Sequence, residues 1–484
     1  MGGYVRFILV LLILLCAGPF ASEAAEPTRD QIIHFLNRIS YGPAPGDIET
    51  AQQVGLEVYL AQQLHPETLR TPADLTEHLD DLKTIHMSLA EMTERYAVPL
   101  EEAAHNKDED AARDARRAAE DIVNDMIRGR MLRAAKSPAQ LQEVMTDFWY
   151  NHFNVSVDKG LDRIWIGSYE RDAIRPHALG RFRDLLEATA RHPAMLEYLD
   201  NLHNVAPTGP DKNGKRQGIN ENYAREIMEL HTLGAGGGYT QQDVTQLAYI
   251  LTGWGVDHNT RSTFFFDPKR HAGGDKVLLG NVIKGGGAEE IETALDLLAR
   301  HPSTAKHLSY QLAQYFVADD PPPALVQRMS DVYLKTDGDI AAVLNALFHS
   351  PEFWDPKTYN NKFKSPWHYV ASIMRATGIE SDEEMDLWNN TLKQLGEPLY
   401  RFATPNGYPN TNNFWLSSDG LLKRIDITRN FVNQREKEGT PLQAVGLIHT
   451  LGDNFDPESL NAIARAPLKL QPALVLSSPE FLYY

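Results

Sequence analysis

Apolar residues recur along most of this chain at the three- and four-residue spacing of an amphipathic helix. The clearest stripes lie in residues 244–251, 291–298 and 340–347, where positions i, i+3, i+4 and i+7 are all apolar. This spacing gathers the apolar side chains on one face, which is then buried against a core. Strict alternation of apolar and polar residues, which is typical of half-buried strands, is scarce. The pattern therefore predicts an all-α protein.

Two short runs are nevertheless suited to strands, at residues 263–267 and 277–279. Between them, residues 269–275 contain the glycines of a turn. We expect these two runs to pair with each other as one minor β-hairpin.

Residues 74–135 form a long, charged, helical stretch that is interrupted at Pro99. Opposite charges such as Glu109 and Arg113 stand four residues apart, as they do on exposed helix faces. Basic residues gather at the C-terminal end, where cations favour the helix dipole. We expect a charged helical hairpin arm that projects from the rest, either as a solvated surface or as a partner-binding element.

Helix starts are marked by residues that accept a hydrogen bond from the first helical turn. Proline at the first helical position has no N–H to leave unsatisfied, so Ser-Pro is a favourable start. We expect serine caps at four such pairs and weaker histidine caps at two His-Pro pairs: Ser137, Ser350, Ser365, Ser478, His192 and His301.

Residues 1–24 have the features of a cleaved signal peptide. Arg6 gives a basic start, residues 7–15 an apolar run too short to span a membrane, and residues 22–24 a small-x-small cleavage site. The remaining residues, 25–484, are numerous enough to bury a core without disulfides, and the single cysteine leaves with the signal. We expect a periplasmic or secreted protein with one large multi-helical domain and no membrane span after cleavage.

The formal net charge is −18. An acidic surface of this size disfavours nucleic acid and anionic membranes as partners. It also keeps an exported protein soluble, so the charge by itself identifies no partner.

Residues 220–254 form the densest group of motifs, with the pattern of a helix, a glycine turn and a second helix. Asn222, Glu226 and Glu229 share one face of the first helix. Its other faces are apolar, which predicts a helix buried all round. The glycines of residues 234–238 end it, and Thr240 begins the next helix with Asp243 in the position of a capping box.

Two carboxylates on such a helix have two interpretations. Buried acids are unfavourable unless they are paired. Either Arg225 and another base neutralise Glu226 and Glu229 as a structural network, or the acids carry out chemistry.

Two further groups of polar residues are candidates for chemistry. On one predicted helix, Asp147 and Asn151 share a face beside His152, which is either a hydrogen-bonded core histidine or a general base or proton donor. In the predicted hairpin turn, His271 and Lys276 belong either to a solvated tip or to a reactive loop.

Several ordered motifs together resemble the bacterial domain-of-unknown-function family 1800. They are FLNRISYGP, DFWYNHFNV, NENYAREIMELHTLG with GGYTQQDVTQLAYILTGW, FDPKRHAGGDKVLLG and the terminal SSPEFL. The resemblance covers most of the mature chain and implies no substrate. It implies a protein partner, because members are commonly encoded beside a family of phosphatase-like secreted proteins. Two departures are Ala272, where the family more often has an acid, and PNGYP at residues 405–409, one of several variants there.

No metal or cofactor is required by the spacing of the candidate ligands. The calcium-like start at Asp211 lacks its later ligands, and the mature chain has no cysteine. His152, His231 and Glu226 have the chemistry of metal ligands without a motif that joins them. The cofactor and metal therefore stay unknown.

Two classes of function remain open. The first is an exported hydrolase or lyase that acts on an envelope or environmental polymer with helix-borne carboxylates. The second is a non-enzymatic binding or assembly factor for a co-encoded secreted protein. The candidate catalytic residues are Asp147, His152, Glu226 and Glu229, and the candidate substrate-binding residues are Asn151, Asn222, Arg225, Tyr239, Trp254, His271 and Lys276. We expect Asn222, Glu226, Glu229 and His152 to converge on one pocket beside the turn at residues 236–238.

Overall fold

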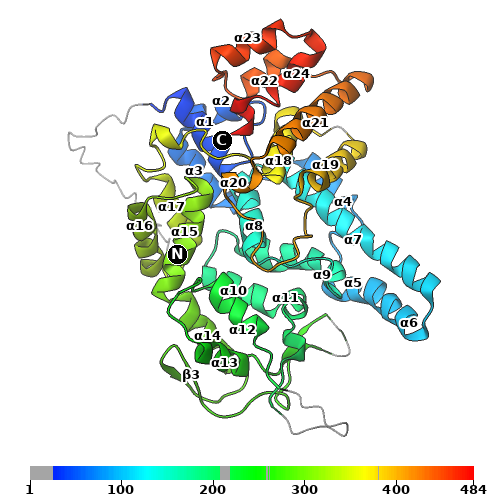
Figure 1. Ribbon diagram of the computed structural model, residues 1–484, viewed down its shortest axis with the longest axis vertical. Helices are drawn as coiled ribbons and strands as arrows, with labels where there is room; N and C mark the ends of the chain where they lie inside the picture. Colours follow the sequence, from blue (N-terminus) through cyan, green and yellow to red (C-terminus); the bar gives the residue numbers. More distant parts are fainter. Residues whose placement is uncertain (1–25, 208–217, 258–259, 261, 380) are drawn as a thin grey trace, which may run out of the picture.

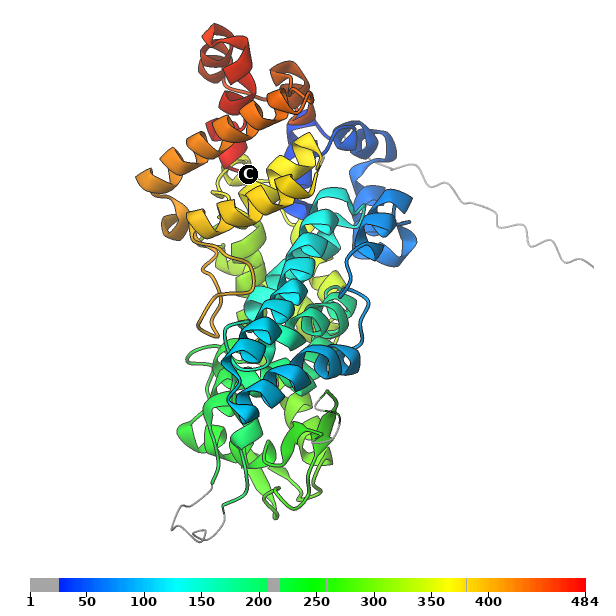
Figure 2. The same cartoon turned by 90° about the vertical axis from the view of Figure 1, so that its right-hand side faces the viewer.

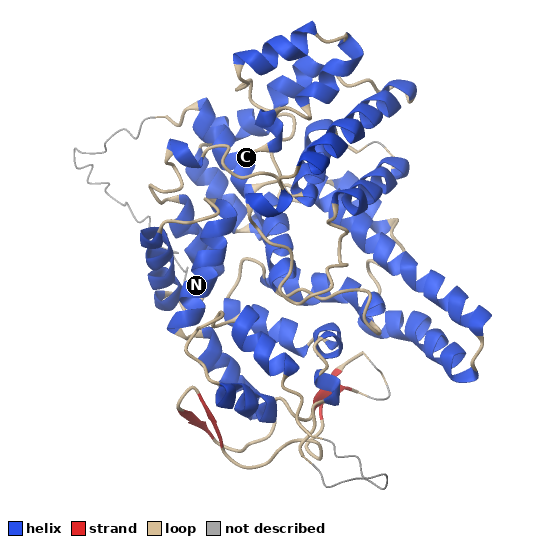
Figure 3. Ribbon diagram, in the orientation of Figure 1, coloured by secondary structure: helices blue, strands red, loops and turns tan. Residues whose placement is uncertain are grey.

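The computed structural model describes residues 26–207, 218–257, 260, 262–379 and 381–484. Within this part helices dominate and the strands form two small sheets, as the apolar spacing predicts (Figure 3). No helix in the described part of the chain is long and apolar enough to cross a membrane. The predicted signal peptide at residues 1–24 and the calcium-like residues near Asp211 lie outside the described residues.

The first third of the chain is helical and leads to α8 at the centre of the molecule (Figure 1). Its elements are α1 (Arg29–Ile39), α2 (Asp47–Val54), α3 (Leu56–Leu64), η1 (Pro66–Thr68), α4 (Ala73–Asp80), α5 (Leu89–Met92), η2 (Thr93–Ala97), α6 (Val98–Asn106), α7 (Glu109–Lys136) and α8 (Gln140–His152).

The middle third forms the lower part of the view in Figure 1 and contains both sheets. Its elements are α9 (Asp162–Ser168), η3 (Tyr169–Ile174), η4 (Arg175–His177), α10 (Phe182–Arg191), α11 (Pro193–Tyr198), η5 (Asn201–His203), α12 (Asn222–Glu226), η6 (Ile227–His231), α13 (Gln241–Ile250), β1 (Trp254–Val256), β2 (Phe264–Phe266), β3 (Lys276–Leu278), β4 (Asn281–Ile283) and α14 (Glu289–Ala299).

The last third returns past α8 and ends near α1. Its elements are α15 (Pro302–Phe316), α16 (Pro323–Lys335), α17 (Ile340–Phe348), η7 (Pro356–Thr358), α18 (Pro366–Thr377), α19 (Asp382–Leu395), α20 (Asn412–Trp415), α21 (Ser418–Lys437), α22 (Ala444–Thr450), α23 (Pro457–Arg465), η8 (Leu468–Leu470), α24 (Gln471–Val475) and α25 (Pro479–Leu482).

The apolar stripes and most of the caps are confirmed. The three predicted stripes are the buried faces of α13, α14 and α17. Ser365 and Ser478 cap α18 and α25 with their hydroxyls, and the ring nitrogens of His192 and His301 cap α11 and α15. The predicted caps at Ser137 and Ser350 are wrong: both hydroxyls accept a backbone N–H within a turn, and neither begins a helix.

The prediction of a single hairpin is wrong in its pairing. Residues 264–266 pair antiparallel with residues 254–256, and residues 276–278 pair with residues 281–283. Both predicted runs are strands, but each finds a different partner. Alternation along one strand indicates which face it buries and does not identify the neighbouring strand.

The charged segment 74–135 projects only in its distal part. In Figure 1, α6 and the start of α7 form the tip at the lower right, and Figure 2 views the molecule from that side, so that the tip points toward the viewer. From Ala119 onward, α7 buries Ile122, Val123 and Met126. The expected arm therefore ends near Ala119, because the second half of α7 carries an apolar face that the charged residues obscure in the sequence.

Buried apolar side chains form one connected cluster that extends from Ile32 to Leu482. Its two ends meet beside α8. Backbone hydrogen bonds join Lys362 to Tyr484 and Lys364 to Leu482. They hold the terminal motif beside the start of α18. This closure brings four distant parts of the chain around one pocket.

Candidate functional site

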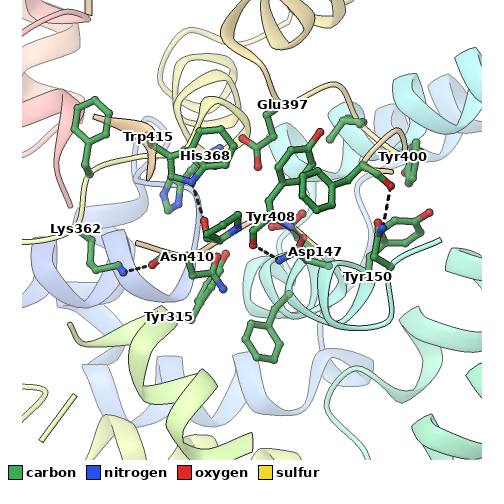
Figure 4. Close-up of a pocket in the computed structure, with 18 of the residues that line it drawn as sticks. Asp147, Tyr150, Tyr315, Lys362, His368, Glu397, Tyr400, Tyr408, Asn410 and Trp415 are labelled. Carbon is green, nitrogen blue, oxygen red and sulfur yellow. Dashed lines mark hydrogen bonds between the residues drawn. The ribbon is translucent and has the colours of Figure 1, made fainter. Parts of the chain in front are cut away.

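A pocket lies where α8, the start of α18, residues 397–410 and the last residues of the chain meet (Figure 4). The charged and polar groups that line this central pocket include Arg130, Asp147, Asn151, Lys362, His368 and Glu397. Aromatic rings form much of the remaining wall: Tyr150, Tyr315, Phe402, Tyr408, Trp415 and Tyr484. The enclosed volume is about 60 Å³, which is room for a small functional group or a few waters.

Helix α8 is the platform of the pocket. Leu141, Val144 and Met145 are fully buried and fix the helix against the core, so the spacing of the helix turns Asp147 and Asn151 toward the pocket.

Asn151 holds the loop at residues 405–409 over this platform. Its Nδ2 donates to Tyr408 O at 2.8 Å, and its Oδ1 accepts from Tyr408 N at 2.7 Å. Gly407 has φ 65°, and a Cβ there would lie 2.2 Å from Asn151 O. A side chain is therefore excluded at Gly407, and the variant PNGYP sequence forms one edge of the pocket. The candidate Asn151 uses its amide to position this loop.

Asp147 forms an ion pair with Arg130 of α7, whose side chain is 5% exposed. Arg130 also lies 3.3 Å from Glu170, which in addition accepts hydrogen bonds from Arg175 at 3.0 Å and from the Tyr400 hydroxyl at 2.8 Å. Glu170 is carried by η3, a π-helical turn of a kind that is frequent at functional sites.

The two acids in this network differ in charge. Burial opposes ionisation of Glu170, but the charges of Arg130 and Arg175 outweigh it and lower its pKa. Asp147 has a single arginine partner, and burial raises its pKa to about 6. Glu170 is therefore the permanent counter-ion of the arginines, and Asp147 is the acid whose protonation changes near neutral pH.

Glu397 is the second acid of the pocket. It follows Gly396, the left-handed C-cap of α19, and its Oε2 accepts from Trp367 N at 2.6 Å in the first turn of α18. Burial raises the pKa of Glu397 to about 8, against the opposing hydrogen bond from Trp367 and with support from the charge of Asp147. Glu397 is therefore mostly protonated at neutral pH, whereas Asp147 is mostly ionised.

His152 lies at the buried end of α8. Its Nε2 is 3.1 Å from His231 O, and burial, followed by the charge of His307, lowers its pKa to about 3. It borders a shallower hollow beside the central pocket, together with Gln311 and Asn406. A histidine with this pKa is neutral at physiological pH and is a weak base.

We expect His152 to lie in one pocket with Asn222, Glu226 and Glu229. Among the described residues, no hydrogen bond joins the side chain of His152 to any of these three. Glu226 and Glu229 are partly exposed, so the helix is not buried all round. Burial, followed by the charge of Glu229, raises the pKa of Glu226. Glu229 accepts from the Tyr239 hydroxyl at 3.3 Å, and Asn222 donates to Leu199 O at 3.2 Å.

Arg225 does not pair with Glu226. It lies 3.3 Å from Glu221 and donates to Gln241 at 2.9 Å, which ties α12 to α13. The predicted capping box of Thr240 and Asp243 is confirmed at the start of α13. These contacts stabilise the turn between the two helices.

Trp254 is 1% exposed and lies beneath the guanidinium of Arg191, whose carbon is 5.5 Å from the ring centroid. It therefore presents no free face for stacking with a ligand. Trp254 also packs edge-on against Phe264 of the paired strand β2, with ring centroids 4.7 Å apart.

His271 and Lys276 meet a carboxylate from outside their motif. Glu290 of α14 lies 3.1 Å from the Nε2 of His271 and 2.6 Å from the Nζ of Lys276, and all three side chains are buried. Gly286 N and Gly287 N donate to the same carboxylate at 3.0 and 3.1 Å. Residue 272 is alanine where the family more often has an acid, and Glu290 places a carboxylate beside His271 instead. The cluster holds the loop before β3 against α14.

No group of three or more metal-ligating side chains of suitable geometry occurs among the described residues. His152 and His231 lie in ring contact, with centroids 6.1 Å apart, but Glu226 does not complete a ligand set with them.

Residues 34–483 match the family described as a protein of unknown function, DUF1800. The chain belongs to this family. The match confirms the resemblance that the separate motifs indicate. No curated protein matches the chain, and no solved structure matches it.

Of the family motifs, residues 147–155 line the central pocket directly. Two others lie next to its wall: Arg38 of residues 35–43 lies over the ring of Tyr484, and Leu482 of the terminal motif accepts a hydrogen bond from Lys364 N. Residues 220–254 and 266–280 lie instead in the lower part of Figure 1.

Sequence reasoning missed Glu397, Glu170 and Arg130. Glu397 stands outside every quoted motif, and Arg130 is hidden among the charges of α7. Arg130 has one usable signal: Val123, Ile127 and Ala134, at helical spacing from it, are apolar and predict that this face of α7 is buried.

Proposed function

We propose that the protein is an exported hydrolase or lyase that acts on an envelope or environmental polymer with Asp147 and Glu397 as its acid–base pair. The observation that supports this most strongly is the placement of two acids in one aromatic-walled pocket, where burial raises the pKa of both. Two carboxyl groups held in different protonation states are the minimal equipment for cleaving a glycosidic bond. The proposal retains Asp147 from the sequence candidates and replaces Glu226 and Glu229 with Glu397.

Glu397 would act as the general acid. A carboxyl group with a pKa of about 8 keeps its proton at neutral pH and can give it to a leaving oxygen. Its hydrogen bond from Trp367 N fixes one oxygen, so the other is the group that carries the proton.

Asp147 would act as the base or nucleophile. Its pKa of about 6 leaves it mostly ionised at neutral pH, and Arg130 orients it. Glu170 and Arg175 hold Arg130 in turn, so the carboxylate has a rigid support. Preorganised ionic groups of this kind favour charge development without rearrangement.

The aromatic wall supports a polymer as the substrate. The enclosed volume of about 60 Å³ accepts one linkage or substituent, so the rest of a chain would lie along the partly exposed rings of Phe402, Tyr408 and Trp415. Aromatic faces offer broad apolar contact with little loss of conformational entropy.

The test is a comparison of three purified variants. Release of new chain ends should be assayed on a panel of envelope and extracellular polysaccharides with Asp147→Asn, Glu397→Gln and the matched control Glu226→Gln. Loss of a general acid or base lowers the rate by about 100-fold or more. Full activity in the first two variants, together with loss in Glu226→Gln, would move catalysis to α12. Absence of cleavage of every polymer by the parent protein would reject the enzyme.

A second candidate is the binding or assembly factor, and exposed apolar residues near the C-terminus favour it. Leu422 is 65% exposed, Val445 80% and Leu468 83%. Single exposed apolar residues are common, but a set on neighbouring helices marks an interaction surface more often. Retention of a co-encoded secreted protein on the immobilised parent chain, lost on Val445→Ser with Leu468→Ser, would support this function.

We also propose that the protein is exported and that its signal peptide is cleaved. N-terminal sequencing of the protein recovered outside the cytoplasm should begin at residues 25–27, and an intact Met1 would contradict it.

A further inference from the structure

One wall of the central pocket is rich in positive charge, in contrast to the acidic protein as a whole. Lys362 and His368 line it, to the left of Asp147 and Tyr400 in Figure 4. The Nζ of Lys362 donates to Asn410 O at 2.7 Å and pairs with Asp319. An ammonium group has three donors, so one N–H of Lys362 is left for a ligand.

Three further cations stand behind this wall. Arg38 lies over the Tyr484 ring at 4.8 Å, Lys364 over the Phe481 ring at 4.2 Å, and Arg424 donates to Lys364 O at 2.7 Å. None of the three forms an ion pair with a carboxylate in the described part of the chain. Arg38 and Arg424 are 1% and 2% exposed, so water does not replace the missing counter-ion.

Several polar atoms of this wall also have no hydrogen-bond partner among the described residues. They are Nε and Nη1 of Arg38, Nη1 of Arg424 and Nε2 of His368. Burial, followed by the charges of Lys364 and Arg38, lowers the pKa of His368 well below its usual range. Burial and Arg424 together lower the pKa of Lys364 to about 7. Unpaired buried donors and unneutralised charges are unfavourable, and a bound anion would relieve both.

The acids of the pocket do not cancel this charge. Asp147 is neutralised by Arg130, and Asp319 by Lys362. Glu397 is mostly protonated at neutral pH, because its pKa is about 8. The wall that contains His368 therefore faces the pocket with excess positive charge, and low-dielectric surroundings concentrate its field in the pocket.

We propose that this wall binds the oxyanion group of an acidic ligand, through the free N–H of Lys362 and the ring of His368, with Arg38, Lys364 and Arg424 providing the field. On the proposed function, on which this inference builds, the substrate is a polymer whose units carry a carboxylate, sulfate or phosphate. A neutral imidazole has one N–H and donates one hydrogen bond to such a group.

The first experiment locates the anion. Crystals of the mature protein, grown without sulfate, phosphate or carboxylate buffers, are soaked in selenate and examined by anomalous diffraction at the selenium edge. Selenate between Lys362 and His368 is the expected result. Selenate only elsewhere, or none, would overturn the inference.

The second experiment measures affinity by calorimetry with selenate, inorganic phosphate, glucuronate and the neutral sugar glucose. Glucuronate should bind at least about tenfold more tightly than glucose, and the selenate and phosphate arms identify the preferred oxyanion. His368→Phe keeps a ring in contact with Tyr484 and removes the Nε2 donor, and Lys362→Gln removes the charge. Both should weaken oxyanion binding about tenfold or more, whereas Lys284→Gln, a change at an 82% exposed lysine, should not.

The outcomes separate this inference from the proposed enzyme. Binding is measured without turnover, so absence of polymer cleavage with oxyanion binding retained would reject the enzyme alone. Equal affinity for glucose and glucuronate, or cleavage of neutral polymers only, would overturn the oxyanion site. If Lys362→Gln unfolds because it strands Asp319, His368→Phe and the selenate position still decide.

Discussion

The central pocket and residues 222–229 both hold a pair of acidic side chains, and the two pairs differ in their partners and in the burial of Glu397. Glu397 is buried, and Asp147, whose side chain is 22% exposed, is in ion-pair contact with the buried Arg130; burial raises the pKa of Asp147 to about 6 and that of Glu397 to about 8. Glu226 and Glu229 share one helix face that remains partly exposed, and Glu229 is hydrogen-bonded to Tyr239. Water can solvate the second pair, so its acids need no buried counter-ion.

The difference shows that the densest motif of a sequence and its most perturbed acids can lie in different places. Residues 220–254 are dense because a helix, a glycine turn, a capping box and a second helix follow one another without a gap. The pocket is assembled instead from segments more than 200 residues apart, such as Asp147 and Glu397. Three variants test this contrast, in order of decreasing effect.

Arg130→Met should give the largest loss of stability. It leaves Asp147 and Glu170 without their shared cation, and removing one partner of a buried ion pair costs about 3–5 kcal/mol. The matched control is Arg225→Met, which removes a 39% exposed side chain paired with Glu221 and should cost no more than about 1 kcal/mol. Urea unfolding of both variants measures the difference. Equal losses of unfolding free energy in the two variants would show that the ion pairs of Arg130 and Arg225 contribute equally to stability.

Glu397→Gln should change how stability depends on pH. The pKa of Glu397 in the folded protein is about 8, above its usual value of 4.5, so between these values the native state holds a proton that the unfolded chain releases. Raising the pH through this window therefore destabilises the parent. The variant resembles the protonated form, so it should match the parent near pH 4.5 and exceed it at pH 8 by on the order of a few kcal/mol.

Glu226→Gln serves as the control for this pH dependence. The pKa of Glu226 is also raised, by burial and by Glu229, so the sign is the same. Its partial exposure should make the effect much smaller, because solvent screens the charge. The test is to measure the unfolding free energies of the parent and both variants at pH 5 and pH 8.5. A pH effect in Glu226→Gln as large as that in Glu397→Gln would remove the distinction between the two regions.

The fold was largely predictable because helices are specified locally. The stripes at residues 244–251, 291–298 and 340–347 and the caps at Ser365 and Ser478 each depend on residues within a few positions. Strand pairing depends on distant partners, and here the alternation predicted strands but not which strands pair. In α7, the many charged residues similarly obscured the apolar face of its second half, which is buried.

The site was predictable only in part, for a related reason. Asp147 and Asn151 are visible because an apolar helix carries few polar residues. Glu397 has no such contrast around it, since it follows a glycine at a helix end and is buried where the first turn of α18 packs against it. Its partner Asp147 is 250 positions away, and no local pattern connects them.

Thr240→Ala should have the smallest effect and completes the comparison. The Thr240 hydroxyl accepts from Asp243 N, and the Asp243 carboxylate accepts from Thr240 N at 2.8 Å and from Leu279 N at 2.7 Å. The capping box thus starts α13 and holds the β3–β4 turn against it. Loss of a threonine cap costs about 1 kcal/mol.

Thr293→Ala, an exposed change inside α14 that removes no cap, should be neutral or slightly stabilising because alanine is the better helix former. If residues 220–254 serve as a structural unit, Thr240→Ala lowers the unfolding free energy while polymer cleavage per folded molecule stays at the parent level. A large loss of cleavage in Thr240→Ala, at a temperature where the variant is fully folded, would instead place this segment in the reaction, despite the exposure of Glu226 and Glu229.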